Sequence, residues 1–241
     1  DLPSLAGADI VIEAVNEDLK LKKQMLREIE THVSTDTIIA TNSSSLSLEE
    51  LSAVLKQPER FIAIHFFNPV NRMPLVEIAR APETTDQTLS TALSLARSLG
   101  KTPIVVGGKP GFVSNRVLFP YLLEALHLTE RIEDFNEIDR LACQFGLPMG
   151  PYQLMDEIGI DVTVKIASSL ERAFGDRYRC PDIALNLVKA GMLGRKSGAG
   201  FYSYVPSRSI KLNSAAMALR PTVDRSKASQ MDFHACLSLM A

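Results

Sequence analysis

The chain has 241 residues, of which 46% are hydrophobic and 22% are charged, a balance typical of soluble globular proteins that argues against a disordered or fibrous chain. Its 26 basic and 28 acidic side chains give a formal net charge of −2 without a basic tract, which argues against nucleic acid or an anionic membrane as partner. The three cysteines (Cys143, Cys180, Cys236) are too widely spaced for a metal site and predict free thiols in a reducing compartment, and no apolar run reaches the roughly 18–20 residues of a membrane span.

The first half of the chain alternates short apolar runs with amphipathic segments. The runs predict strands at 8–15, 37–41, 61–67 and 102–106, with a further, antiparallel strand at 75–78. Helices are predicted at 17–32, 48–55 and 84–99; the first gathers Leu19, Met25, Leu26 and Ile29 near one face, and the last is closed by Gly100. Strands that alternate with helices in this way predict an open α/β sheet.

The pattern becomes helical after a cluster of chain breakers, which consists of Gly107, Gly108, Pro110 and Gly111. Helices are predicted at 115–131, 135–145, 156–174 and 183–190. A domain boundary is therefore expected near residue 107. Residues 206–241 have weak periodicity and are expected to form a linker or the start of a further helical region.

His65 lies at the end of an apolar strand, and ligands of open α/β sheets bind at the ends of strands. Histidine ionises near neutral pH, and Glu77 could accept a hydrogen bond from its second ring nitrogen, so the pair suits proton transfer. The alternative is a satisfied core histidine beside Phe61, Phe66 and Phe67, which local sequence alone favours.

Ser44 and Asn115 are two further candidates. Ser44 belongs to a polar run that follows the strand at 37–41, and Asn115 follows the cluster of chain breakers. Either side chain could hold a substrate oxygen. Short polar side chains at these places also cap helices, and for each residue alone capping is the simpler interpretation.

Six motifs follow one another along the chain: NSSSL at 42–46, HFFNPV at 65–70, MPLVEI at 73–78, PGFVSNR at 110–116, GLPMGP at 146–151 and GRKSGAGFY at 194–202. In this order and spacing they resemble the successive signatures of the 3-hydroxyacyl-CoA dehydrogenase family. The resemblance runs from about residue 8 to residue 204. The segments at 73–77 and 100–106 look closer to the dehydrogenase segment of the large multifunctional fatty-acid oxidation proteins than to the stand-alone enzymes.

The resemblance implies a partial Rossmann-type NAD-binding domain at 1–107 and a helical, 6-phosphogluconate-dehydrogenase-like domain at 108–205. It implies NAD-dependent oxidation of L-3-hydroxyacyl-CoA to 3-oxoacyl-CoA in fatty-acid β-oxidation. The implied partners, besides this substrate and product, are a second copy of the chain or a thiolase-containing complex. The implied location is the bacterial cytoplasm, with the mitochondrion and the peroxisome as alternatives.

Residue by residue, His65 matches the family's catalytic base and Glu77 its carboxylate partner, while Ser44 and Asn115 match the residues that bind the reacting oxygen. The positions that match contacts to the ribose and nicotinamide of NAD are Ala14, Glu17, Lys22 and Asn42. Glu17 and Lys22 also suit the solvated first turns of a helix, so a surface role is the alternative for these two. No metal ligand is implied.

The chain departs from the family in lacking the glycine-rich phosphate loop. The strand–GxGxxG–helix fingerprint should precede residue 8, and no GxGxxG occurs elsewhere. The glycines at 194–200 have the spacing GxxxGxG after a helix and are expected to form a structural turn. Since the first residue is Asp1 rather than Met, we expect a partial chain that binds NAD weakly or not at all and that exposes an edge strand.

Two other functions compete with the dehydrogenase. Ser44, His65 and Glu77 have the residue types of a hydrolase triad, but their order differs from that of α/β-hydrolases and no GxSxG motif is present. The second alternative is a truncated fragment that is inactive or serves only as an interaction module.

Overall fold

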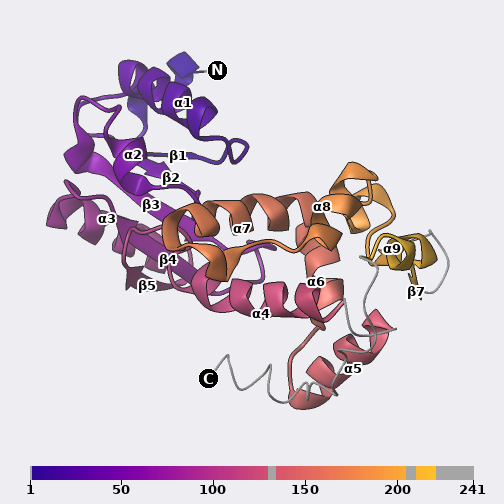
Figure 1. The fold of residues 1–241 in the computed structure, drawn as a ribbon. Coiled ribbons are helices and arrows are strands. Elements are labelled where there is room, and N and C mark those ends of the chain that lie inside the picture. Colours follow the sequence, from indigo (N-terminus) through magenta and orange to yellow (C-terminus); the bar gives the residue numbers. More distant parts are fainter. Residues whose placement is uncertain (1, 130–133, 205–209, 221–241) are drawn as a thin grey trace. The chain divides into compact units, whose positions relative to one another are not determined.

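The computed structural model describes residues 2–129, 134–204 and 210–220 (Figure 1). The chain divides into two compact units, one up to Asn115 and the other from Arg116 onward, and each is described by itself. Within the described residues, no helix combines the length and the hydropathy needed to cross a membrane.

The first unit is built on a five-stranded sheet whose strands follow their order in the chain. The strands are β1 (Ile10–Glu13), β2 (Ile38–Thr41), β3 (Phe61–Phe66), β4 (Leu75–Arg80) and β5 (Thr102–Val106). The first three are parallel, β4 runs antiparallel to β3, and β5 is parallel to β4. The predicted open sheet and its antiparallel strand are therefore confirmed.

Helices cover both faces of this sheet. The helices of this unit are η1 (Leu2–Gly7), α1 (Leu19–His32), α2 (Leu48–Ser52), η2 (Pro58–Arg60) and α3 (Asp86–Ser98). Helices α1 and α2 pack on one face and α3 on the other (Figure 1). Alternate residues of β3 supply both cores, since Phe61 and Ala63 face α1 and α2 while Ile62 and Ile64 face α3. This double burial explains the unbroken apolar run.

The second unit is mainly helical. Its elements are α4 (Ser114–Leu128), which begins at the boundary, α5 (Phe135–Phe145), α6 (Pro151–Ile158), α7 (Ile160–Phe174), η3 (Asp176–Tyr178), α8 (Asp182–Lys189), η4 (Arg195–Ser197), β6 (Tyr202–Ser203), β7 (Lys211–Leu212) and α9 (Ser214–Ala218). Strands β6 and β7 form a short antiparallel pair. The helical character expected after the chain breakers is confirmed.

Two expectations for this unit were wrong or incomplete. The single helix predicted at 156–174 is two helices, because Gly159 takes a φ of +100° that ends α6 and starts α7. Within the expected linker at 206–241, residues 210–220 contain β7 and α9, while 206–209 and 221–241 lie outside the described residues.

The buried side chain of Asp156, in α6, anchors the segment around β6. Its buried carboxylate accepts hydrogen bonds from the backbone N–H groups of Phe201 (3.0 Å) and Tyr202 (2.9 Å) and from the Tyr204 hydroxyl (3.0 Å). A Cβ at Gly200 would lie 1.9 Å from the Asp156 Oδ1 atom, so only glycine fits there. Burial raises the pKa of Asp156 to about 6, although these hydrogen bonds oppose the rise.

This raised pKa predicts that the fold loses stability as the pH rises. The native state holds the Asp156 proton more tightly than an unfolded chain, whose aspartates ionise near 3.8. The stabilisation is therefore fully present below about pH 4 and is lost as the pH rises through about 6. We expect the difference in unfolding free energy between wild type and Asp156→Asn to shrink over this range in urea titrations. Asp176→Asn, at an exposed aspartate, is the control. A difference that grows with pH would contradict the assignment.

Candidate active site

Side chains from three neighbouring strands gather at one edge of the sheet. The parallel strands β1, β2 and β3 end there, and β4, which runs the other way, begins there. Ala14 follows β1 and is exposed, Asn42 follows β2, and His65 lies at the end of β3. This edge is the place where open α/β sheets bind ligands.

His65 and Glu77 form a pair that the strand register brings together. They stand directly opposite each other in the antiparallel pairing of β3 with β4, and His65 Nδ1 lies 2.9 Å from Glu77 Oε2. The Glu77 side chain is fully buried, whereas 14% of the His65 side chain is exposed. Among the described residues, the second ring nitrogen of His65, Nε2, has no hydrogen-bond partner. His65 is therefore not a fully satisfied core histidine.

The Glu77 carboxylate accepts three more hydrogen bonds, all from the segment that begins α4. The backbone N–H groups of Val113 (3.1 Å) and Ser114 (2.9 Å) donate to Oε1, and the Ser114 hydroxyl donates to Oε2 at 2.7 Å. Burial alone would raise the pKa of Glu77, but the hydrogen bonds from His65 and Ser114 outweigh it and hold the pKa below its usual value. Glu77 therefore stays a carboxylate that can stabilise a protonated imidazole.

Ser44 and Asn115 also meet, although they are 71 residues apart in the chain. Asn115 Nδ2 donates to the Ser44 hydroxyl at 2.9 Å, and the Ser44 carbonyl accepts the Gly111 N–H. Between these contacts lies Phe112, whose backbone has a φ of +46° and whose ring packs edge-on against His65 at 6.0 Å. A left-handed non-glycine residue is strained, and such strain concentrates at functional sites. One loop thus contacts both Ser44 and the His65–Glu77 pair.

A buried polar network lies beneath the loop that carries Ser44. Lys22 Nζ donates to both oxygens of Glu13 (3.0 and 2.9 Å) and to the Val15 carbonyl (3.0 Å), and the Lys22 and Glu13 side chains are each only 1% exposed. All three ammonium hydrogens therefore have acceptors within the chain. Lys22 also lies 3.6 Å from Glu17 Oε2. The surface role considered for Lys22 is thereby wrong.

Glu17 in turn binds the residues on either side of Ser44. Its Oε1 atom accepts hydrogen bonds from the hydroxyls of Ser43 (2.5 Å) and Ser45 (2.6 Å). Asn42 ties the same loop to the strand of His65, since its Oδ1 atom accepts the Phe66 N–H at 3.0 Å. The loop is thus held from both sides.

Sequence reasoning missed four members of these networks, namely Glu13, Ser43, Ser45 and Ser114. A signal was present for Glu13, because a glutamate within an apolar strand needs a buried partner. Its partner Lys22 shares the buried stripe of α1 with Leu26 and Ile29, at helical spacing. Nothing in the sequence indicates which of the serines around Ser44 and Asn115 contact carboxylates, because these contacts depend on tertiary structure.

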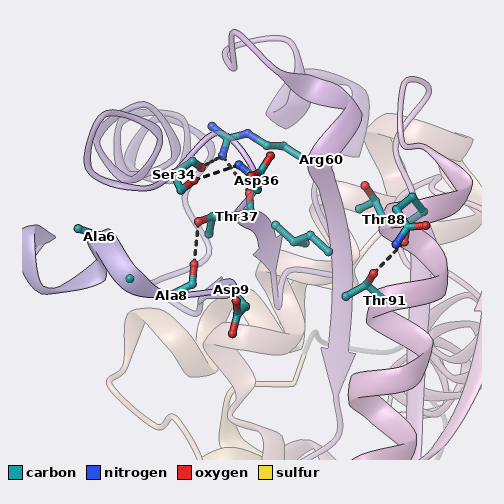
Figure 2. Close-up of a pocket in the computed structure, with 12 residues that line it drawn as sticks. Ala6, Ala8, Asp9, Ser34, Asp36, Thr37, Arg60, Thr88 and Thr91 are labelled. Carbon is teal, nitrogen blue, oxygen red and sulfur yellow. Dashed lines mark hydrogen bonds between the residues drawn. The ribbon is translucent and has the colours of Figure 1, made fainter.

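A hollow of about 490 Å³ lies at the opposite, amino ends of the same strands. Its lining includes Asp9, Thr37 and Arg60, which directly precede β1, β2 and β3 (Figure 2). Arg60 Nη1 donates to the carbonyls of Ser34 (2.6 Å) and Thr37 (2.9 Å), so its guanidinium ties loops together. The predicted site residues lie at the other end of the sheet.

Comparison with known families gives two matches that together span most of the chain. Residues 1–109 match the family described as 3-hydroxyacyl-CoA dehydrogenase, NAD binding domain. Residues 111–204 match 3-hydroxyacyl-CoA dehydrogenase, C-terminal domain. The resemblance inferred from the motifs is confirmed.

Curated relatives and solved structures agree with these matches. The chain is 45% identical over 204 residues to the fatty acid oxidation complex subunit alpha of Vibrio parahaemolyticus, which covers 85% of this chain and 29% of that protein. The corresponding subunit of Idiomarina loihiensis is 44% identical over 211 residues, which make up 88% of this chain and 30% of that protein. The chain therefore spans less than a third of the length of these relatives, and the expected likeness to the multifunctional proteins is confirmed.

Among solved structures, M. tuberculosis FadB2 superposes with a TM-score of 0.82 at 37% identity. The (S)-3-hydroxybutyryl-CoA dehydrogenase PaaH1 of Ralstonia eutropha gives 0.79 at 41% identity. Each match covers 85% of this chain and 74% of the other. The partial Rossmann-type and helical fold class is thereby confirmed.

The buried Glu13–Lys22 pair is expected to be worth far more to stability than the neighbouring exposed pair. Lys22→Met leaves the Glu13 carboxylate buried without its cation, which typically costs about 3–5 kcal/mol of unfolding free energy. Lys23→Met is the matched control, since Lys23 pairs with Glu50 at the surface and such pairs contribute about 1 kcal/mol or less. Urea unfolding followed by far-ultraviolet circular dichroism measures both, as the chain has no tryptophan. Equal losses in the two variants would show that Lys22 does not anchor the network.

Proposed function

The chain belongs to the 3-hydroxyacyl-CoA dehydrogenase family, and from this premise we propose that it oxidises L-3-hydroxyacyl-CoA to 3-oxoacyl-CoA with NAD in fatty-acid β-oxidation. The observation that carries the proposal is the His65–Glu77 pair, in which Nδ1 is held by a buried carboxylate while Nε2 has no partner among the described residues. A ring held in this way can take up and release a proton at one defined atom.

The strand ends offer a set of groups that fits NAD. The Glu17 side chain is 27% exposed, and among the described residues its Oε2 atom pairs only with Lys22, at 3.6 Å, so it can accept a hydrogen bond from a ribose hydroxyl. Ala14 is exposed and directly follows β1, and Asn42 directly follows the neighbouring strand β2. Lys22 would support the site through Glu17, because its three hydrogens are already donated. When bound, NAD supplies the acceptor for the hydride that leaves the substrate carbon.

In the oxidation, His65 Nε2 accepts the proton of the substrate hydroxyl and the ring becomes an imidazolium. Glu77 stabilises this cation through Nδ1 and fixes the tautomer that leaves Nε2 free to accept. The hydrogen bonds that hold the pKa of Glu77 below its usual value keep the carboxylate charged throughout. In the reverse reaction the protonated ring donates the same proton to the oxygen of the 3-oxo group.

Ser44 and Asn115 bind the reacting oxygen in this proposal. The Ser44 hydroxyl already accepts a hydrogen bond from Asn115, so its own hydrogen is left to donate to a third group. The second hydrogen of the Asn115 amide can donate to the same oxygen. Two such donors fix the direction of the substrate hydroxyl relative to Nε2, which places the reacting atoms in line.

The hydrolase alternative finds no support in the contacts of Ser44. Its hydroxyl is paired with Asn115, and no hydrogen bond joins it to His65. A nucleophilic serine would need the histidine as its base.

The curated relatives also suggest the setting in which this chemistry occurs. They are named as alpha subunits of a bacterial fatty acid oxidation complex. We propose accordingly that the chain is the dehydrogenase segment of such a subunit and acts in the bacterial cytoplasm. Its proposed assembly partners are a thiolase-containing complex or a second copy of the chain.

His65→Ala is expected to lower the turnover number by about 10²- to 10⁴-fold, the usual contribution of a positioned acid–base group. The assay is acetoacetyl-CoA-dependent oxidation of NADH by the full-length polypeptide that carries this sequence. His127→Ala, at an exposed histidine of α4, should leave turnover unchanged. The NADH dissociation constant should stay near the wild-type value in both variants. If His65→Ala retains wild-type turnover, another group is the base.

A further inference from the structure

Glu77 has two side-chain donors, and both reach the same oxygen. His65 Nδ1 lies 2.9 Å from Oε2, and the Ser114 hydroxyl donates to Oε2 at 2.7 Å. The backbone N–H groups of Val113 and Ser114 occupy Oε1 instead. Among the described residues, the hydroxyl of Ser114 is thus the one donor that shares an acceptor atom with the histidine.

Because the two donors share this oxygen, the Ser114 hydroxyl shifts the protonation equilibrium of His65 in a definite direction. A hydrogen bond from a hydroxyl withdraws negative charge from the carboxylate oxygen, which makes that oxygen a weaker acceptor for other donors. The charged form of His65 depends on Glu77 more than the neutral form does. Ser114 must therefore favour the neutral ring relative to a Glu77 that lacked this hydroxyl.

We infer that Ser114 is a positioning residue that tunes how strongly Glu77 supports the protonated form of His65, and thereby keeps the ring available as a base. The inference rests on the proposed function, in which neutral His65 takes the hydroxyl proton. Ser114 acts only through Glu77 and is not expected to touch the substrate. Its own backbone N–H bond to Oε1 holds the hydroxyl in register with Oε2.

The other groups around the pair do not compete with this effect. The rings of Phe67 (4.7 Å) and Phe112 (6.0 Å) that face His65 are uncharged, and β5 places Ile104 opposite Glu77. The charged residues of the adjoining loop and helix start are Lys109 and Arg116, and both are exposed. In the described part of the chain, His65 is the titratable side chain that interacts with Glu77.

The test is a titration of the His65 ring followed by NMR of ¹⁵N-histidine-labelled protein, with His65 assigned from the signal missing in His65→Gln. Ser114→Val and Ser114→Thr form a matched pair of equal shape, of which only threonine keeps the hydroxyl. We expect Ser114→Val to raise the titration midpoint of His65 by about 0.3 to 1 pH unit. In Ser114→Thr the His65 midpoint should differ from the wild-type value by no more than about a third of the shift seen in Ser114→Val. Ser114→Ala, a second hydroxyl-free variant, should agree with valine.

Two controls establish the direction of the shift in the His65 titration midpoint. Glu77→Gln removes the negative charge and should move the His65 midpoint in the opposite direction, to lower pH. His32, the last residue of α1, whose ring contacts the Glu28 carbonyl, should titrate identically in all variants. A His65 midpoint that stays put or falls in both Ser114→Val and Ser114→Ala would overturn the inference.

Kinetics then separate this inference from the proposed function. In the oxidation direction the acidic limb of the pH–rate profile should move to higher pH in Ser114→Val by the shift that NMR records. If His65→Ala abolishes turnover while Ser114→Val leaves the His65 midpoint unmoved, the inference about Ser114 fails and the proposed base stands. If the midpoint moves but His65→Ala keeps full turnover, the proposed base fails while the coupling of Ser114 to His65 remains.

Discussion

The antiparallel register of β4 against β3 is the constraint on which the site depends. It sets His65 opposite Glu77 on the face of the sheet that α1 and α2 cover, with Ile64 and Ile78 turned to the other face. A shift of β4 by one residue would turn Glu77 toward the core beneath α3 while His65 stayed on the opposite face, so the pair would be lost. The apolar residues on either side of the pair therefore fix its geometry, because burying them correctly leaves one register. The position of the proposed catalytic pair and the packing of the core are two results of the same strand pairing.

Much of the fold could be predicted from the sequence because its strands are buried on both faces and its helices have one apolar stripe. The runs around Ile39 and Ile62 predict central strands for this reason, and the observed α1 and α5 agree with the helical periodicity. The division of α6 from α7 could not be predicted, since the apolar spacing continues across Gly159 and only its backbone conformation breaks the helix. The short β7 and α9 likewise have too few residues for a period to show.

The candidate site likewise has a part that the sequence predicts and a part that it does not. The motif order placed Ser44, His65, Glu77 and Asn115 near one another, and the structure brings them together in two hydrogen-bonded pairs. Their catalytic roles stay predictions, as do those of the residues proposed to hold NAD. The supporting contacts from Ser43, Ser45 and Ser114 could not be anticipated. A serine is compatible with caps, turns and solvent alike, and only the folded chain shows which hydroxyl lies within reach of a carboxylate.

The four hydrogen bonds to Glu77 also give this residue two separate structural roles, one for each carboxylate oxygen. Its Oε1 atom fixes the backbone where α4 begins, while Oε2 serves the imidazole. Loss of the carboxylate would therefore lower the amount of folded protein in a cell and, in the proposed mechanism, the rate per molecule as well, whereas loss of the His65 ring would leave the Oε1 contacts with the α4 backbone in place. In a deep mutational scan that reads abundance and activity separately, position 77 would stand out in both channels and position 65 in one. The two carboxylate oxygens of Glu77 thus link the mutational tolerance of a proposed catalytic residue to the folding of the helix beside it.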